Sequence, residues 1–486
     1  MQCLYKIIDS LNKKERTIVL GLVGLIIICF VSIFVKPNQV YVEGIIGSPR
    51  YINPVLAQNN DVDLDLTELI FSSLISDLTE NYEISDNQQE YTLFLKKDLK
   101  WHDSKPITAD DIMFTIQIIQ DPVYQSPLRI NFQGVGIEKI DECTVKFILK
   151  DVYAPFLASL DIGILPKHIW QEISPQSFAL AEANIKPIGS GSYKFKNLEK
   201  GKNGGIKSIN LETADSSISI KNIILKFYPN EEALIDAFLA RQVDGLSYVS
   251  PKNLEKINNN TNIYKITIPR YFAVFFNLDK IKDLKTRQSL AAVVDKQKII
   301  DQVLLGQGQK AGPEYDFEKT NINLSFNLIT TSWPELVQTA EILKQEWQEA
   351  GAEVEIQIIE SNSIQNDYIR PRNYDALLFG EVLSADPDPF AFWHSSQKKD
   401  PGLNLSVYDN PKADKLLVDA RQTLDSEKRA ELYKQFEELL KQDLPAIFLY
   451  NSTCLYAVSK KVHGIELDKI ALPSKRFENI EQWSIR

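Results

Sequence analysis

The sequence predicts an α/β protein built in more than one lobe, and three observations carry this prediction. Segments with the two-residue period of strands alternate with segments that have the period of helices along most of the chain. Near the middle, a strand, a helix and a second strand follow one another at the spacing of a parallel βαβ unit. The chain also has 486 residues, which is more than one hydrophobic core ordinarily holds.

The first element of the chain is an uncharged apolar run, Ile18–Val35. As a helix it extends about 27 Å, which matches the hydrocarbon core of a membrane. Basic residues precede the run at Lys13, Lys14 and Arg16, and only Lys36 follows closely. Because positively charged flanks stay in the cytoplasm, we expect residues 1–17 inside, 18–35 as a single-pass anchor in the cell membrane, and the rest outside.

Two other kinds of N-terminal segment compete with an uncleaved helix. A cleavable signal peptide needs a small-x-small site just after the apolar run, and the residues after Val35 offer none. A lipoprotein anchor would use Cys29, although Ile28 stands where a small residue is usual. An uncleaved helix is therefore the expectation, with lipidation at Cys29 as the main alternative.

The next clear elements lie between residues 91 and 122. Tyr91–Leu95 alternates with a period of two, which predicts a strand. Thr108 is a good N-cap for a helix with apolar residues at positions 112, 116 and 119, and the acidic pair after it favours the positive helix end. Asp121-Pro122 ends this helix.

The βαβ unit begins with a strand over Leu324–Thr330. Ser332 is placed to cap a helix from about Pro334 to Ala350, and Gly351 is placed to stop it. The elements that follow are a strand over 354–358, a strand over Tyr374–Gly380, a helix capped by Asp425 or Ser426, and a strand over Ile447–Tyr450. A parallel sheet with flanking helices is therefore expected.

Composition excludes some classes of protein. The formal net charge is −11, and the body is more acidic still, because the first 35 residues hold four basic groups against two acidic ones. Such a body repels nucleic acid, so no nucleic-acid partner is expected. Of the four cysteines, only Cys143 and Cys454 lie beyond the N-terminal segment, and a bridge between them is not expected.

Motifs of common enzymes are missing from the sequence. The four histidines are not spaced at i and i+4, and there is no H-E-x-x-H, Walker A loop, Rossmann glycine fingerprint or G-x-S-x-G elbow. Gly189–Ser192 precedes a strand and favours a plain turn, and His102 beside Asp103 favours a structural role. We expect no enzyme, no metal site and no cofactor.

The most informative stretch for a binding site is Ser384–Trp393, which follows the strand Tyr374–Gly380. In open α/β sheets, ligands collect at the carboxyl ends of strands. Asp388-Pro389 has a ready structural duty as N-cap and first helical residue. Asp386 has no such duty, so it either pairs with a ligand ammonium or closes a turn on its own backbone.

The segment between Tyr91 and Thr115, TLFLKKDLKWHDSKPITADDIMFT, resembles a motif of family 5 of the extracytoplasmic solute-binding proteins of ABC transporters. This family comprises oligopeptide-, dipeptide- and nickel-binding receptors, and the resemblance runs from about residue 41 to 480. Asp98 and Ser104 stand where the family usually has glycine, and both look like turn positions. Further similar segments are PIGSGSY (187–193), ARQVDG (240–245), LKTRQSLAAVVD (284–295), Tyr374–Phe390 and YDNPKAD (408–414).

This resemblance implies a periplasmic-binding-protein fold of class II, cluster C type, in which a solute lies between two closing lobes. It implies a main subdomain of lobe 1 at 36–60, 188–268 and 445–486, a subdomain inserted in lobe 1 at 61–187, and lobe 2 at 269–444. Asp386 resembles the aspartate that receives a peptide's amino terminus, and Tyr271, Phe272 and Asn277 resemble residues of the crossing strand that lines the cleft.

The function that the resemblance implies is that of a membrane-anchored, extracytoplasmic receptor. It would bind peptides and deliver them to the permease subunits of an ABC importer. Two alternatives remain beside it. One is a receptor for another solute, such as a metal chelate, a sugar or an opine-like compound, and the other is a membrane-tethered sensor or scaffold with the same fold.

Overall fold

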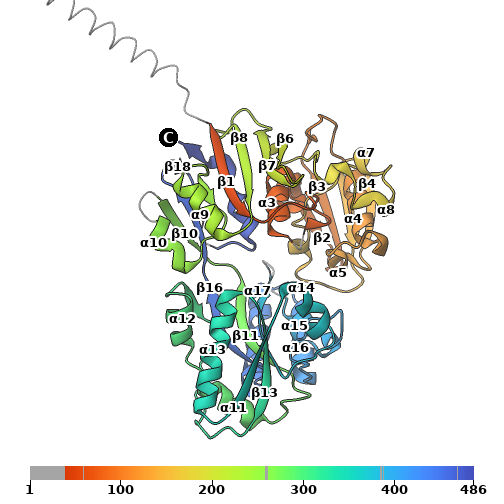
Figure 1. Cartoon of the computed structure of the whole chain (residues 1–486). Helices are drawn as coiled ribbons and strands as arrows, with labels where there is room; N and C mark the ends of the chain where they lie inside the picture. Colours follow the sequence, from red (N-terminus) through yellow and green to blue (C-terminus); the bar gives the residue numbers. More distant parts are fainter. Residues whose placement is uncertain (1–38, 58–59, 258–260, 384–385, 387, 468) are drawn as a thin grey trace, which may run out of the picture.

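The computed structural model describes residues 39–486 except 58–59, 258–260, 384–385, 387 and 468, and it places them in two lobes (Figure 1). Lobe 1, the upper body in Figure 1, holds a seven-stranded and a four-stranded sheet, and lobe 2, the lower body, holds a six-stranded sheet. Helices flank these sheets, so the predicted α/β fold in more than one lobe is confirmed.

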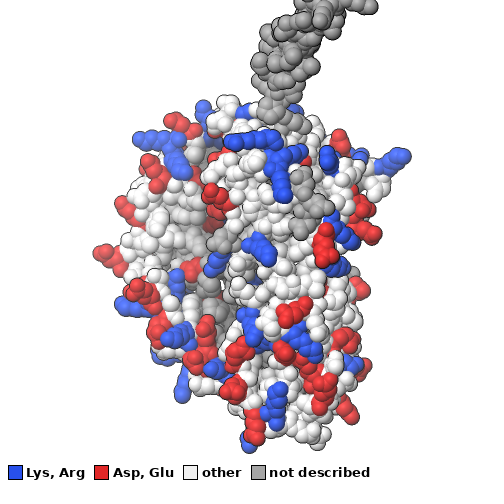
Figure 2. Space-filling model, turned by 90° about the vertical axis from the view of Figure 1, so that its left-hand side faces the viewer, with Lys and Arg blue, Asp and Glu red and all other residues white. Residues whose placement is uncertain are grey.

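The predicted membrane anchor, residues 18–35, lies outside the described residues. Among the residues that the structure does describe, no helix is both long and apolar enough to cross a membrane. On the face of the molecule in Figure 2, basic and acidic side chains are intermixed over both lobes.

The seven-stranded sheet of lobe 1 has the order β10-β17-β9-β1-β8-β7-β6. Its strand β1 pairs in parallel with β8 and β9, and the other pairs are antiparallel. Helix α3 covers one face, where Val62, Leu66 and Leu69 join the strands in one apolar core. The elements are β1 (Val40–Ile46), α3 (Asp61–Ile70), β6 (Tyr193–Lys200), β7 (Ile206–Thr213), β8 (Asn222–Tyr228), α9 (Glu231–Leu239), β9 (Gly245–Leu246), α10 (Leu254–Ile257), β10 (Thr261–Ile266), β17 (Cys454–Ser459) and η9 (Pro473–Phe477).

The four-stranded sheet of lobe 1 is antiparallel throughout, in the order β2-β3-β5-β4. Its elements are β2 (Thr79–Ile84), β3 (Glu90–Leu95), α4 (Ala109–Gln120), α5 (Arg129–Phe132), β4 (Gly136–Asp141), β5 (Thr144–Ile148), α6 (Phe156–Ser159), α7 (Lys167–Trp170) and α8 (Pro175–Phe178). The backbone N–H of Thr108 donates to the Asp111 carboxylate at 2.9 Å, which forms a capping box at the start of α4. The predicted strand near residue 91 and the helix capped by Thr108 are both confirmed.

The six-stranded sheet of lobe 2 has the order β12-β16-β11-β15-β13-β14. Its strand β13 pairs in parallel with β14 and β15, so the predicted βαβ unit is confirmed. The elements are β11 (Arg270–Phe276), α11 (Leu284–Ala292), α12 (Lys296–Val303), β12 (Gly308–Lys310), β13 (Ser325–Thr331), α13 (Pro334–Glu349), β14 (Glu353–Ile359), α14 (Ser361–Ile364), β15 (Ala376–Val382), α15 (Phe390–Trp393), α16 (Pro411–Arg421), α17 (Ser426–Asp443) and β16 (Ala446–Ser452).

The ends of two helices in lobe 2 test the capping predictions. Asp425 caps α17 by accepting hydrogen bonds from two backbone N–H groups, as expected. The predicted cap Ser332 is wrong by one residue, because Trp333 occupies the N-cap position of α13 and Pro334 fixes the first helical residue. Gly351 follows the helix with a φ of 98°, as its role as the stop requires.

Two short connections join the lobes. Residues 267–269 lead from β10 in lobe 1 to β11 in lobe 2, and Thr453 separates β16 in lobe 2 from β17 in lobe 1. The expected boundary at residue 445 therefore shifts to Thr453, because one almost unbroken extended stretch pairs first with β11 and then with β9 and β10. The other expected domain boundaries stay a prediction.

Candidate functional site

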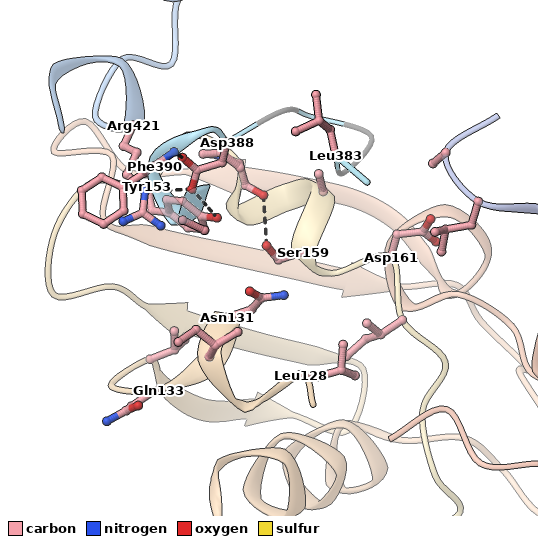
Figure 3. A pocket seen from close by; sticks show the side chains of 18 of the residues that line it. Leu128, Asn131, Gln133, Tyr153, Ser159, Asp161, Leu383, Asp388, Phe390 and Arg421 are labelled. Carbon is pink, nitrogen blue, oxygen red and sulfur yellow. Dashed lines mark hydrogen bonds and ion pairs between the residues drawn. The ribbon is translucent and has the colours of Figure 1, made fainter. Parts of the chain in front are cut away.

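A cavity of about 1070 Å³ lies between the two lobes (Figure 3). Lobe 1 lines it with one side of α3, the segments 128–135 and 149–163, and the C-terminal segment 471–475. Lobe 2 lines it with Val382 and Leu383 at the end of β15, the start of α15, and the last turn of α16. The cavity therefore adjoins the carboxyl end of a strand in a partly parallel sheet, where ligands collect in α/β folds.

On the lobe 1 wall, one basic side chain is shared by two acidic ones. Lys475 lies 3.3 Å from Glu68 and 3.1 Å from Asp161. Burial raises the pKa of Glu68 to about 7, although the positive charge of Lys475 opposes that shift. These charges are therefore already paired within the wall of the cavity.

At one side of the cavity the lobes touch through a group of five residues, Tyr153, Ala154, Asp388, Phe390 and Arg421, which we call the interlobe bridge. Arg421 donates to Asp388 at 2.8 Å, and the Tyr153 hydroxyl donates to the same oxygen at 3.3 Å. The Arg421 guanidinium lies 5.0 Å from the ring centre of Tyr153 and 4.0 Å from that of Phe390. The backbone N–H of Ala154 donates to the Arg421 carbonyl at 2.7 Å.

The bridge is partly buried, with the Arg421 side chain 32% and the Asp388 side chain 11% exposed. Burial, together with the nearby Asp388 carboxylate, raises the pKa of the Tyr153 hydroxyl to about 12, so it remains a donor at neutral pH. Figure 3 shows Tyr153, Arg421, Asp388 and Phe390 gathered on one side of the cavity, with Leu128 and Asn131 across from them. The structure thus holds its lobes in contact along that side.

Asp386, the predicted ligand aspartate, lies in the loop after β15, as expected from the sequence. Its carboxylate accepts from Nη2 of Arg429 on α17, at 3.1 and 3.0 Å from the two oxygens. Both side chains are partly buried. No sequence pattern indicates this partner, since the two residues belong to different elements. The role of Asp386 as a solute contact stays a prediction.

Tyr271 and Phe272 stand at the start of β11, near the crossing between the lobes. The Tyr271 hydroxyl donates to Glu381, its direct neighbour on β15. Phe272 faces the other side of the sheet, is 4% exposed, and packs against Tyr450 and Trp333. Neither side chain is among the described residues that line the cavity, and their role as solute contacts stays a prediction.

Asn277 follows the other end of β11. Antiparallel pairing sets Arg270 beside Val382 and Phe276 beside Ala376, so Asn277 lies at the end of the strand remote from the cavity. Its side chain is 3% exposed, donates to the Arg372 carbonyl at 3.0 Å and accepts from the N–H of Asp279 at 3.0 Å. These contacts fix the turn after β11, and a contact with solute stays a prediction.

In the described parts of the chain, the histidine and cysteine side chains weighed in the sequence analysis have structural contacts or no partner that suggests catalysis. His102 Nε2 lies 2.9 Å from the Gly191 carbonyl, which ties the turn after β3 to the turn before β6. Cys143 and Cys454 are free thiols. Within the part of the chain that the structure describes, no cluster of three His, Cys, Asp or Glu residues is arranged to hold a metal ion.

Comparison with known proteins places these features in context. Residues 73–316, half of the chain, match the profile of the bacterial extracellular solute-binding proteins, family 5. The oligopeptide-binding protein AppA of Bacillus subtilis is 27% identical over 92% of this chain and 92% of its own length.

Two solved structures extend the likeness to three dimensions. That of Bacillus subtilis AppA with a nonapeptide is 26% identical, covers 93% of this chain and 100% of its own, and has a TM-score of 0.75. That of Campylobacter jejuni NikZ with Ni(L-His) is 25% identical, covers 92% of this chain and 100% of its own, and also has a TM-score of 0.75.

Proposed function

The chain belongs to the bacterial extracellular solute-binding proteins of family 5, and from this premise we propose that it binds peptides between its lobes and delivers them to an ABC importer. One observation carries the proposal. The cavity of about 1070 Å³ lies between lobes that the chain links by two short connections, as a solute-enclosing receptor requires. Its volume is at the upper end of the ~300–1,000 Å³ of small-molecule sites, which suits an oligopeptide.

Lobe closure supplies the binding step. Rotation about residues 267–269 and Thr453 brings the two walls together around the solute. Closure removes water, which strengthens each charged contact inside. Val382, the last residue of β15, lies on the wall, and its backbone is proposed to pair with an extended peptide as a further strand does. The backbone N–H of Leu383 already donates to the Pro269 carbonyl at 2.7 Å.

Asp386 is proposed to receive the peptide's amino terminus. A carboxylate has about four acceptor positions, so it can accept from an ammonium while it also accepts from Arg429. Such a charge-assisted hydrogen bond is about twice as strong as a neutral one. Together with backbone pairing, it makes recognition depend on the peptide's amino terminus.

The proposal extends to the place of the receptor in the cell. Residues 18–35 would anchor it, with the lobes on the outer side, and lipidation at Cys29 is the alternative attachment. A cysteine introduced at Asn38 should react with a membrane-impermeant thiol reagent on intact cells. Labelling that occurs only after lysis would overturn this orientation.

The first test of the function identifies the cargo directly. Native mass spectrometry of the protein purified from its own host should show a co-purified peptide. A bound sugar or metal chelate would instead establish the second candidate, a receptor for another solute. That candidate is favoured by one observation, the 25% identity to the NikZ structure that holds Ni(L-His).

The second test concerns Asp386. Asp386→Ala should weaken binding of the co-purified peptide by about 2–5 kcal/mol, as expected when one partner of a buried charge pair is removed. Because this variant leaves Arg429 unpaired, the double variant Asp386→Ala/Arg429→Met should be measured beside it, with the exposed Asp367→Ala as the control. Acetylation of the peptide's amino terminus should weaken binding similarly. If calorimetry finds that Asp386→Ala binds the peptide with unchanged affinity, Asp386 does not contact the peptide's amino terminus.

A further inference from the structure

The wall of the interlobe cavity exposes large apolar side chains from both lobes. Ile130 on α5 is 74% exposed, and Val382 and Leu403 in lobe 2 are 46% and 41% exposed. Exposed aliphatic side chains that share one concave surface mark a site that another molecule covers. All three side chains line the same cavity, so one solute can cover them together.

Several charged groups of the same wall are already paired within the protein, whereas Lys150 and Asp151 line the cavity as exposed side chains. Asp388 is held by Arg421 and Tyr153, and Lys475 is held by Glu68 and Asp161. Asp77 accepts from the backbone N–H of Ser73 at 2.7 Å. To pair with Asp388, Lys475 or Asp77, a charged side chain on the solute would have to compete with these contacts, whereas an apolar side chain leaves them in place.

On the lobe 1 side of the cavity, the segment around Ile130 carries no charge. The segment 130–136, with the sequence INFQGVG, contains only apolar and amide side chains and glycine. In Figure 3, Leu128 and Asn131 of lobe 1 lie across the cavity from Leu383 of lobe 2. A side chain that lies between this segment and Leu383 therefore meets uncharged surface from both lobes (Figure 3).

We propose that Ile130, Val382, Leu383 and Leu403 form an apolar subsite that selects peptides with a bulky apolar side chain, such as leucine or phenylalanine. The inference rests on the proposed peptide-binding function and adds a side-chain preference to it. The gain comes from apolar surface removed from water on the peptide and on both walls at once. Small or charged side chains at the same position gain little, because they cover less apolar surface or lose hydration.

The first experiment uses pentaalanine and four series of its variants, in which one alanine at a time is replaced by leucine, phenylalanine, lysine or aspartate. Calorimetry on the full chain should find one position at which leucine or phenylalanine binds at least about tenfold more tightly than alanine, lysine or aspartate. A factor of ten corresponds to about 1.4 kcal/mol. The position shows which residue of the peptide enters the subsite.

The second experiment removes the subsite. Ile130→Ser and Leu403→Ser replace exposed side chains, so both variants should keep the melting temperature of the wild type. Each should reduce the preference for leucine over alanine at that position by several-fold, and the double variant should reduce it further. Leu180→Ser is the matched control, because Leu180 is 87% exposed and does not line the cavity.

The outcomes separate this inference from the function on which it rests. Equal binding of all the peptides would overturn the subsite and leave the peptide receptor standing. A preference for lysine or aspartate, or a leucine preference that survives the double variant, would overturn it too. Binding of none of the peptides would overturn the peptide receptor and the subsite together.

Discussion

At the scale of single residues, Glu381 is a carboxyl group with one hydrogen-bond donor and no cation beside it. It is 5% exposed, and Tyr271 donates to one of its oxygens while the other has no partner within the described structure. Burial raises the pKa of Glu381 to about 8, because a charge in that place would lose its hydration. The protonated form is therefore the one that fits the folded lobe at neutral pH.

The raised pKa of Glu381 predicts a loss of stability with rising pH. In the unfolded chain a glutamate titrates near pH ~4.3. Between that value and about 8, the folded state holds a proton that the unfolded state has released, so stability falls as the pH rises through this window. Glu381→Gln keeps the neutral shape and removes the titration. Its melting temperature should therefore exceed that of the wild type by at least ~2 °C at pH 8.

Thermal melting at pH 5, 6.5 and 8 checks this prediction. The difference between variant and wild type isolates Glu381, since the buried acids Glu43 and Glu68, whose pKa values are also raised, are present in both proteins. Glu341→Gln, on the exposed face of α13, should leave the profile unchanged. A difference that stays constant from pH 5 to 8 would contradict the assignment.

At the scale of elements, a buried ion cluster links η9, near the C-terminus, to α3 and β1 of the same lobe. Arg476 on η9 donates to both oxygens of Asp65 on α3 at 2.6 Å and lies 3.2 Å from Glu43 on β1. All three side chains are at most 2% exposed. Because the two acids are out of water, each depends on Arg476 for compensation of its charge.

Arg476→Met should cost about 3–5 kcal/mol of unfolding free energy, as expected when one partner of a buried ion pair is removed. Urea denaturation monitored by fluorescence measures this change in unfolding free energy. Lys186→Met is the control, because its i,i+4 pair with Glu182 is solvent-exposed and should contribute nothing measurable. Equal midpoints for the two variants would show that the cluster does not hold the lobe together.

Local signals in the sequence predicted the elements well, because each depends on a few neighbouring residues. Thr108 and Asp425 cap the helices that they were expected to cap. Asp98 and Ser104, which stand where the family usually has glycine, both have a positive φ, of 60° and 71°. The start of α13 was missed, since Pro334 rather than the side chain of Ser332 decides it.

Long-range pairing could not be predicted in the same way. The sequence placed Asp386 correctly after β15, because the end of a strand is a local feature. Its partner Arg429, and the partners of Asp388, come from other elements, with Tyr153 as far as 235 residues away in the chain. No periodicity or cap signals such contacts. The shift of the lobe boundary to Thr453 has the same cause, since the sequence does not say with which strand an extended stretch pairs.

At the scale of the whole molecule, the interlobe bridge is a direct contact between two lobes that the chain links by two short connections. Tyr153 donates to Asp388, and its ring lies against the Arg421 guanidinium. Because Arg421 is 32% exposed, its cation–π contact with Tyr153 is worth about 0.5–1 kcal/mol, and the Tyr153 hydrogen bond adds a contribution of similar size. Opening the lobes must break all of them, so the bridge favours the closed arrangement.

Removal of the bridge should therefore shift the lobes toward an open state. Tyr153→Phe/Arg421→Met should increase the radius of gyration of the solute-free protein in small-angle X-ray scattering and speed solute release by about tenfold. Tyr82→Phe is the matched control, because Tyr82 is an exposed tyrosine of the same lobe. Unchanged scattering together with an unchanged dissociation rate would show that the bridge forms when the lobes close but does not stabilise the closed state. Faster release with unchanged scattering would place its effect in the solute-bound state alone.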